Sequence, residues 1–193
     1  HEAINKMYEL GYVAEDQYSQ KESTAEDARL DNRLTMDLSR QLRHPLATMS
    51  ADADKCYDRI NHIIMSLLLL AIIGTIGPVV AMLHPIQSMK FYQRTARGDS
   101  RSFMGGRDRD NPLQGLCQGN GAAPACWLIV CSVLMHCYKS RGFGSRIISP
   151  ISGVVIDFLG EIYVDDTNLI VMHPDLDTNA AVLKSLYASV EAW

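Results

Sequence analysis

Apolar residues recur at four-residue intervals near the N-terminal end, with polar residues between them. Four leucines, from Leu30 to Leu42, follow the segment Ser23-Thr24-Ala25-Glu26, which has the spacing of a capping box. This pattern predicts an amphipathic helix of about 18 residues. We expect the helix to end at His44-Pro45, because the residue before a proline disfavours the helical region.

The remainder of the chain alternates β-prone segments with longer apolar ones. Strands are expected at 46–53 and, two or three of them, within 153–172, where β-branched residues accumulate. Helices are expected at 58–73, 125–138 and 178–193, and Pro124 stands where a helix can begin. The segment 90–112 is rich in Arg, Gly and Asp, which predicts a loop with one strand. Strands and helices in mixed order indicate an α+β fold.

One apolar segment permits a second interpretation. The 21 residues from Ile63 to Leu83 contain no charge, which meets the length criterion for a membrane-spanning helix. A small membrane protein spanning at 63–83 is therefore an alternative. Gly74, Gly77 and Pro78 interrupt the run near its middle, however, and favour two buried helices joined by a turn. On this second interpretation we expect no membrane partner.

Composition and charge narrow the classes of protein. With 193 residues, 47% hydrophobic and 21% charged, the chain can bury one core, so one domain is expected. A net charge of -4 argues against a simple electrostatic binder of nucleic acid. Local segments differ: residues 90–110 hold six basic and three acidic side chains, and the three charges within 138–150 are all basic. These segments either hold phosphates or form solvated loops.

The five cysteines are odd in number and form no Cys-x-x-Cys pair, so neither a zinc site nor a complete disulfide framework is indicated. An intracellular, reducing setting, nuclear or cytoplasmic, fits this composition best. The chain opens with His1 and stops at Trp193 inside a predicted helix. We therefore expect a fragment cut at both ends.

Three aspartates form the candidate catalytic group. Asp165 and Asp166 lie between two β-rich runs and should occupy a hairpin turn, where aspartate is also common for purely structural reasons. Asp52 ends a predicted strand. If that strand neighbours the hairpin, a spacing of about 4.8 Å brings the carboxylates together. Oxygen ligands of this kind suit Mg²⁺, with Mn²⁺ as an alternative, and two such ions favour nucleotidyl transfer.

The sequence around these acids resembles the reverse transcriptases of non-LTR retroelements. Asp52 followed by Tyr57 is similar to their first palm motif, and Tyr163-Val164-Asp165-Asp166 is similar to their Tyr-x-Asp-Asp motif. Between them, the segment from Gln118 to Ala125 resembles the family's Gln-Gly motif, with proline six positions after the glutamine. The three motifs occur in the family's order, and the resemblance covers residues 16–193.

This resemblance implies a role for each matched acid. Asp52 and Asp165 would be the principal ligands of two Mg²⁺ ions, and Asp166 would be a weaker ligand or a supporting acid. The backbone carbonyl of Ala53 would complete the coordination of the nucleotide-side ion.

The resemblance also implies substrate contacts. Tyr57 would lie under the sugar and exclude a 2′-hydroxyl, so that deoxynucleotides are preferred. Gln118 would contact the incoming nucleotide, and Gly119 would let the backbone approach it.

The resemblance implies an RNA-directed DNA polymerase of a retroelement that uses an RNA template, a DNA primer and dNTPs. The expected architecture is a polymerase palm, a small antiparallel sheet backed by helices, at 46–193, with partial fingers at 1–45 and no thumb. In the finger motif, Ser19-Gln20-Lys21-Glu22 replaces the family's Gly-x-Arg wording. An inactive retroelement relic is therefore a further alternative, and activity from this piece alone is expected to be poor.

Overall fold

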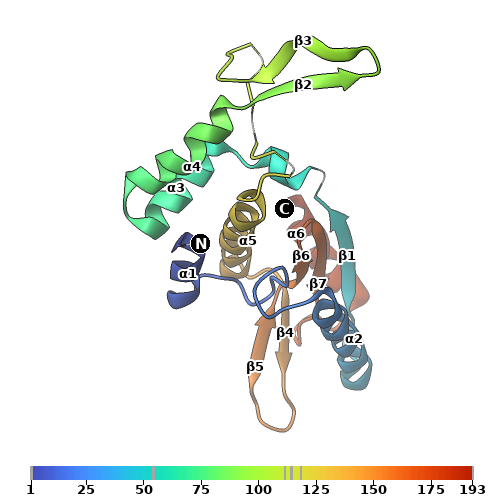
Figure 1. The fold of residues 1–193 in the computed structure, drawn as a ribbon. Coiled ribbons are helices and arrows are strands. Elements are labelled where there is room, and N and C mark those ends of the chain that lie inside the picture. The colour runs from blue at the N-terminus through green and yellow to red at the C-terminus, as the bar shows by residue number, and fades with distance from the viewer. Residues whose placement is uncertain (1, 54, 111, 114, 118, 193) are drawn as a thin grey trace. The chain divides into compact units, whose positions relative to one another are not determined.

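The computed structural model describes residues 2–53, 55–110, 112–113, 115–117 and 119–192. The chain forms two compact units, each discontinuous in sequence: residues 1–10 with 55–130, and residues 11–54 with 131–193. Below, the first is the helical unit and the second is the sheet unit (Figure 1). The assignment of 1–45 to fingers and 46–193 to a palm stays a prediction.

The sheet unit is built on a three-stranded antiparallel sheet. Its strand order is β1 (Ala47–Asp52), β7 (Asp166–Val171), β6 (Gly160–Tyr163), so the strand from the first part of the chain lies beside β7 (Figure 1). A separate hairpin pairs β4 (Ser145–Ile148) with β5 (Val155–Phe158). Two helices, α2 (Ala25–Leu42) and α6 (Asn179–Ala192), belong to this unit, together with the C-terminal part of α5 (Ala123–Ser140). The mixture of helices and small antiparallel sheets confirms the α+β prediction.

One face of the three-stranded sheet is the core of this unit. Ile162 and Leu169 project from this face and are almost completely buried. They pack against Met135 of α5 and Val182 of α6. Because side chains alternate between the two faces of a strand, the residues next to them on β1, β7 and β6 point to the opposite face.

Helix α2 has the predicted length, but its cap is displaced by one residue. Thr24 and Asp27 form the capping box, with the Thr24 side chain accepting from the Asp27 N–H, in place of the predicted pair Ser23 and Glu26. Both pairs offer the same chemistry, so the sequence alone did not separate them. The helix ends at Arg43, which has φ +55, directly before His44-Pro45 as predicted.

The stripe of leucines on α2 is not its buried side. Leu30 and Leu34 are each 55% exposed, and the buried residues of the helix are Ala28, Thr35 and Ser39. Small side chains on the inner surface let a helix lie close to the element that it packs against.

The helical unit contains α1 (Glu2–Glu9), a short 3₁₀ helix η1 (Cys56–Arg59), α3 (His62–Ile73) and α4 (Ile76–Ser88). The helix predicted at 58–73 therefore begins at His62. Asn61 explains the difference, because its side-chain oxygen accepts from the N–H of Ile63 at 2.8 Å and caps the helix there.

The apolar run 63–83 forms two helices, as the interruption by glycine predicts. Gly74 ends α3 with φ +81, and its N–H donates to the Leu70 carbonyl at 2.8 Å. Within the described ranges, no helix is long and apolar enough to cross a membrane. The single long span required by the membrane alternative is not formed by this segment.

Residues 90–105 form a β-hairpin, so the segment 90–112 holds two strands where one was predicted, and its described residues after Gly105 form the loop. Strand β2 (Lys90–Thr95) pairs antiparallel with β3 (Gly98–Gly105), with an irregularity between Tyr92 and Arg94. Every residue of β2 is exposed, so the sequence shows no alternation of buried and exposed positions to predict a strand. This two-stranded element is called the ribbon below.

Candidate active site

Strand pairing brings the predicted acids together within the sheet unit. The register of β1 and β7 places Asp52 directly opposite Asp166, and the Ala53 N–H donates to the Asp165 carbonyl at 3.1 Å. Side chains directly opposite in an antiparallel pair lie on the same face, with Cβ atoms about 4.5–5.5 Å apart. The carboxylates of Asp52 and Asp166 therefore share one face of the sheet, although 113 positions separate Asp52 from Asp165.

The turn that bears Asp165 has an unusual backbone. Tyr163 pairs with Asp166, so Val164 and Asp165 form a two-residue turn between β6 and β7, and Val164 has φ +56. Positive φ at the first turn residue is the pattern of a type II′ hairpin, where glycine is usual. In a β-branched residue this conformation is uncommon and costs energy, and such outliers concentrate at functional sites.

Asp52, Asp165 and Asp166 are all exposed to solvent. Like charges directly opposite one another on neighbouring strands destabilise a sheet unless a cation or another partner compensates them. Over the described part of the chain, no group of three or more His, Cys, Asp or Glu side chains is arranged to hold a metal ion. Asp52 and Asp166 thus form an opposed pair with Asp165 in the adjacent turn, and their role as metal ligands stays a prediction.

The face that bears the acids also holds a polar network. Glu161 is buried, and its carboxylate accepts from the Asn32 amide of α2 at 2.7 Å and from the Asn168 amide at 3.5 Å. The Ser50 hydroxyl in turn donates to Asn168 at 2.5 Å. Burial raises the pKa of Glu161 above its usual value, and the bonds from the two asparagines oppose this shift. The network connects β1, β7 and β6 to α2 beside Asp166.

A cavity of about 400 Å³ lies between α2 and this polar face. Arg29 and Arg33 line it from the helix, whereas Glu161, Tyr163 and Asp166 line it from the sheet. The cavity therefore places two guanidinium groups across from an acidic strand end. Sequence reasoning missed both arginines, although their spacing of four residues puts them on one side of a helix.

The segment before α2 extends the sheet unit along the edge of β6. Gln17 and Ile162 form an isolated parallel β-bridge. In it, the Tyr18 N–H donates to the Ile162 carbonyl at 2.8 Å, and the Ile162 N–H donates to the Asp16 carbonyl at 3.0 Å. The buried Asp16 carboxylate accepts from Lys139 at 2.8 Å. These bonds tie residues 16–18, the start of the predicted finger motif, to the strand that leads into the turn at Asp165.

The predicted substrate-contacting residues belong to the helical unit. The Tyr57 carbonyl accepts from the Leu116 N–H at 2.9 Å, so the segment of Tyr57 lies beside the segment that leads into the Gln-Gly motif. A Cβ atom at Gly115 would collide with the backbone of Asp58, so this approach requires glycine. Gly119 has φ +90, which also favours glycine. Gln118 lies outside the described residues, and the substrate contacts of Tyr57 and Gly119 stay predictions.

Comparison with known proteins gives no sequence match and a weak similarity to solved structures. No family model matches the chain, and no curated protein sequence matches it. A solved structure of telomerase from Candida albicans, in complex with the TWJ fragment of telomeric RNA, is similar with a TM-score of 0.49 and 18% identity. The similarity covers 99% of this chain and 31% of the telomerase chain. The chain thus spans less than a third of the length of that protein.

Proposed function

We propose that the polar face of the three-stranded sheet is the catalytic face of a nucleotidyltransferase, an RNA-directed DNA polymerase of a retroelement. The observation that supports it most directly is the register that sets Asp52 opposite Asp166, next to the turn of Asp165. Two of the three motifs that resemble reverse transcriptases supply these same residues. A palm of this kind needs acids from two distant segments on one sheet face, and β1 and β7 meet this requirement.

The donor set of this face suits Mg²⁺, because carboxylate oxygens are the ligands that hard divalent cations prefer. Asp52, Asp165 and Asp166 would hold the ions, with the Ala53 carbonyl. When bound, two such ions lower the barrier to attack of a primer 3′-hydroxyl on the α-phosphate of a dNTP and stabilise the leaving pyrophosphate. The remaining work of the chain is to bind and orient the substrates.

The cavity beside Asp166 offers two cations on its helix side, opposite the carboxylates of Glu161 and Asp166. Arg29 and Arg33 would bind the β- and γ-phosphates of the dNTP, since guanidinium groups donate two parallel hydrogen bonds to phosphate oxygens. The Glu161 network would hold Asn168 and Asn32 in place around them. The resemblance to reverse transcriptases implies further roles: Tyr57 would exclude ribonucleotides, Gln118 would contact the incoming nucleotide, and Gly119 would allow close approach of the backbone.

The experiment measures two properties of the 193-residue chain and of its Asp166→Asn and Asp165→Asn variants. The first is incorporation of one dTMP on an oligo(dT)-primed poly(rA) template with Mg²⁺ or Mn²⁺. The second is the shift of the unfolding midpoint with Mg²⁺ and dTTP. We expect Asp166→Asn and Asp165→Asn to abolish incorporation and the metal-dependent shift while template binding stays within a few-fold. Without metal, Asp166→Asn should be more stable by about 0.2–1 kcal/mol, because it removes a like-charge pair.

Asp177→Asn is the matched control, since Asp177 is an exposed acid of the sheet unit outside the cavity. It should keep both the incorporation and the metal response of the parent chain. Retained incorporation in Asp166→Asn and Asp165→Asn would contradict the proposal. A metal-dependent shift without any incorporation would favour the alternative of an inactive relic.

A further inference from the structure

The ribbon of the helical unit has a surface that the proposed catalysis does not use. Its two strands pair from Lys90 with Gly105 to Thr95 with Gly98, and every residue of β2 is exposed to solvent. A two-stranded ribbon without a covering layer gains little stability from burial. Its side chains therefore contribute little to folding and are available for contacts with other molecules.

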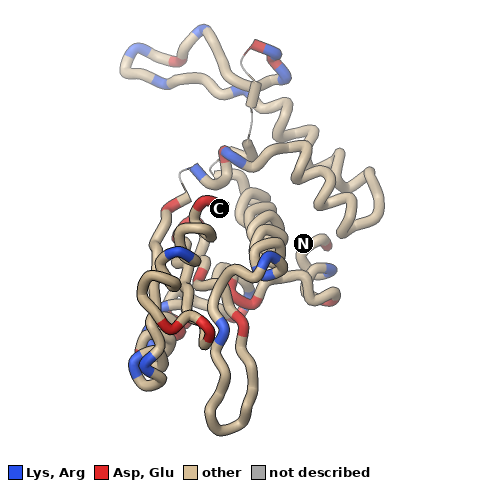
Figure 2. Tube along the Cα trace, turned by 180° about the vertical axis from the view of Figure 1, so that it is seen from behind, with Lys and Arg blue, Asp and Glu red and all other residues tan. Residues whose placement is uncertain are grey.

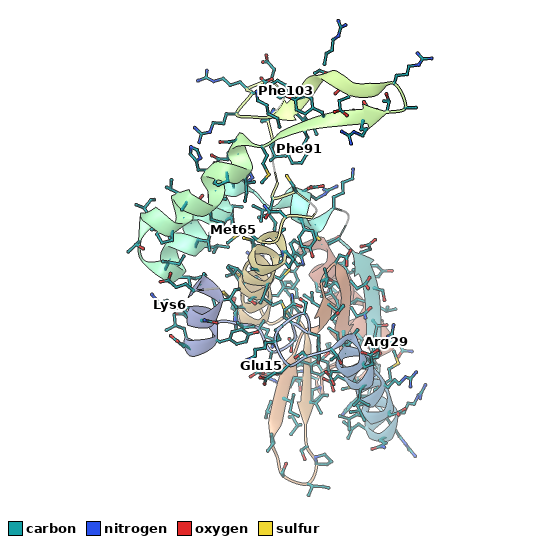
Figure 3. All side chains as sticks on the ribbon, viewed as in Figure 1. Lys6, Glu15, Arg29, Met65, Phe91 and Phe103 are labelled. Atoms are coloured by element: carbon teal, nitrogen blue, oxygen red, sulfur yellow. The ribbon has the colours of Figure 1, made fainter. Side chains whose placement is uncertain are left out.

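Aromatic rings gather on one face of the ribbon. Tyr92 lies opposite Phe103, and their ring centroids are 5.8 Å apart in a tilted arrangement. The ammonium group of Lys90 lies 4.4 Å from the centroid of Phe103. Tyr92 is 50% exposed, which is a large area of ring left in contact with water. Figure 3 marks Phe103 on this element, together with Phe91, which directly precedes Tyr92 in β2 and so points to the opposite face.

Besides Lys90, further cations lie along the ribbon and in its turn. Arg101 is an exposed residue of β3 two positions before Phe103, and Arg97 lies in the turn. Arg94 pairs with Asp99 at 2.8 Å, which neutralises one charge. Six basic and three acidic residues within 90–110 give this segment +3, whereas the whole chain carries -4. Figure 2 shows the basic positions distributed over both strands and the turn.

We infer that this face of the ribbon binds single-stranded nucleic acid. Exposed rings stack on bases of any sequence, and neighbouring cations bind the phosphates between them. Bases in a duplex are already stacked on one another and do not offer their faces to Tyr92 and Phe103, so a single strand fits this surface better. Lys90 beside Phe103 supplies charge complementarity to phosphate, and the exposed Arg101 of β3 and Arg97 of the turn add to it along the ribbon.

The experiment measures binding of fluorescently labelled dT₂₀ and rU₂₀ to the complete chain by anisotropy, at several salt concentrations and without divalent metal. We expect the Arg97→Ala, Arg101→Ala double variant to bind about ten-fold more weakly. The slope of log affinity against log salt should fall by about 0.7 for each phosphate that the variant no longer neutralises. Tyr92→Ala should also weaken binding about ten-fold, whereas Tyr92→Phe, which keeps the ring, should bind like the parent chain.

Arg40→Ala is the matched control, because Arg40 is an exposed cation of helix α2 in the sheet unit. Unchanged affinity in the double variant, an equal loss in Arg40→Ala, or a preference for duplex over single strand would overturn the inference. Binding to phosphatidylserine vesicles with no binding to either oligonucleotide would also overturn it. Because catalysis is not measured, failure here leaves the proposed polymerase untouched, and loss of incorporation in Asp166→Asn leaves the ribbon untouched.

Discussion

The three-stranded sheet and the ribbon are both antiparallel, yet they use their faces in opposite ways. The sheet buries Ile162 and Leu169 under α5 and α6 and keeps its acids on the other face. The ribbon exposes all of β2, with rings and cations side by side. Covering one face of the sheet supplies the stability that allows a repulsive pair such as Asp52 and Asp166 on the other face. The ribbon gains no comparable stability from a covered face, so its side chains lie in contact with water.

The largest difference should appear on truncation of an apolar side chain in each element. Leu169→Ala in the sheet should cost about 2–5 kcal/mol of unfolding free energy, because Leu169 is 1% exposed and leaves a cavity. Phe91→Ala in the ribbon should stay within about 1 kcal/mol, because Phe91 is 38% exposed. Urea unfolding followed by circular dichroism measures both values. Similar losses in the two variants would show that the ribbon has a buried face of its own.

A smaller difference is expected between the ion pairs of the two regions. Lys139→Met should cost about 2–3 kcal/mol, since it leaves Asp16 buried beside the sheet without its cation. Arg94→Met should leave the unfolding midpoint unchanged, since the Arg94–Asp99 pair of the ribbon is exposed to solvent. The measurement is thermal unfolding at pH 7 in low salt and at 0.5 M NaCl. A loss in Lys139→Met that disappears at high salt would contradict burial of that pair.

The smallest effect concerns Glu161 and its dependence on pH. Burial raises the pKa of this carboxyl above 4.5, so the folded state holds its proton more tightly than the unfolded state does. The resulting stability is fully present below pH 4.5 and is lost as pH rises through the folded-state pKa. The glutamine in Glu161→Gln cannot titrate and keeps an oxygen that accepts from Asn32 and Asn168. As pH rises from 4.5 to 7, the unfolding free energy of this variant should therefore increase relative to that of the parent chain.

Asp110→Asn, an exposed acid that follows the ribbon, controls for the change in net charge. It should not reproduce the pH-dependent gain of Glu161→Gln. A parent chain whose stability rises relative to Glu161→Gln over this range would reverse the sign and reject the assigned pKa direction.

The sequence predicted the parts of the site that depend on turns and on strand ends. The β-branched runs around Asp165 predict a hairpin, and Asp52 follows a segment with strand character, so their meeting on one sheet was an expectation that β1 and β7 confirm. The sequence did not show whether Asp165 or Asp166 lies opposite Asp52. The residue opposite is Asp166, because the turn takes two residues and Asp165 is the second of them.

Other features escaped prediction for identifiable physical reasons. Strand β2 of the ribbon has no buried residue, so it lacks the alternation that marks an amphipathic sheet. Arg29 and Arg33 lie at helical spacing, but the four leucines suggested a different inner side for α2 than the one that Ala28, Thr35 and Ser39 provide. Which side of a helix meets a sheet is decided by tertiary packing, and a single sequence contains little of that information.

The valine at position 164 has a consequence for how this molecule can change. Glycine adopts the positive φ of Val164 without steric penalty, so Val164→Gly should relieve the backbone strain of the turn. If the chain is selected only for folding, Val164→Gly should accumulate. If the chain is selected for the function of this face and requires a branched side chain beside Asp52 and Asp166, Val164 should persist. Whether Val164 is replaced by glycine in laboratory evolution therefore separates selection for folding from selection for that function.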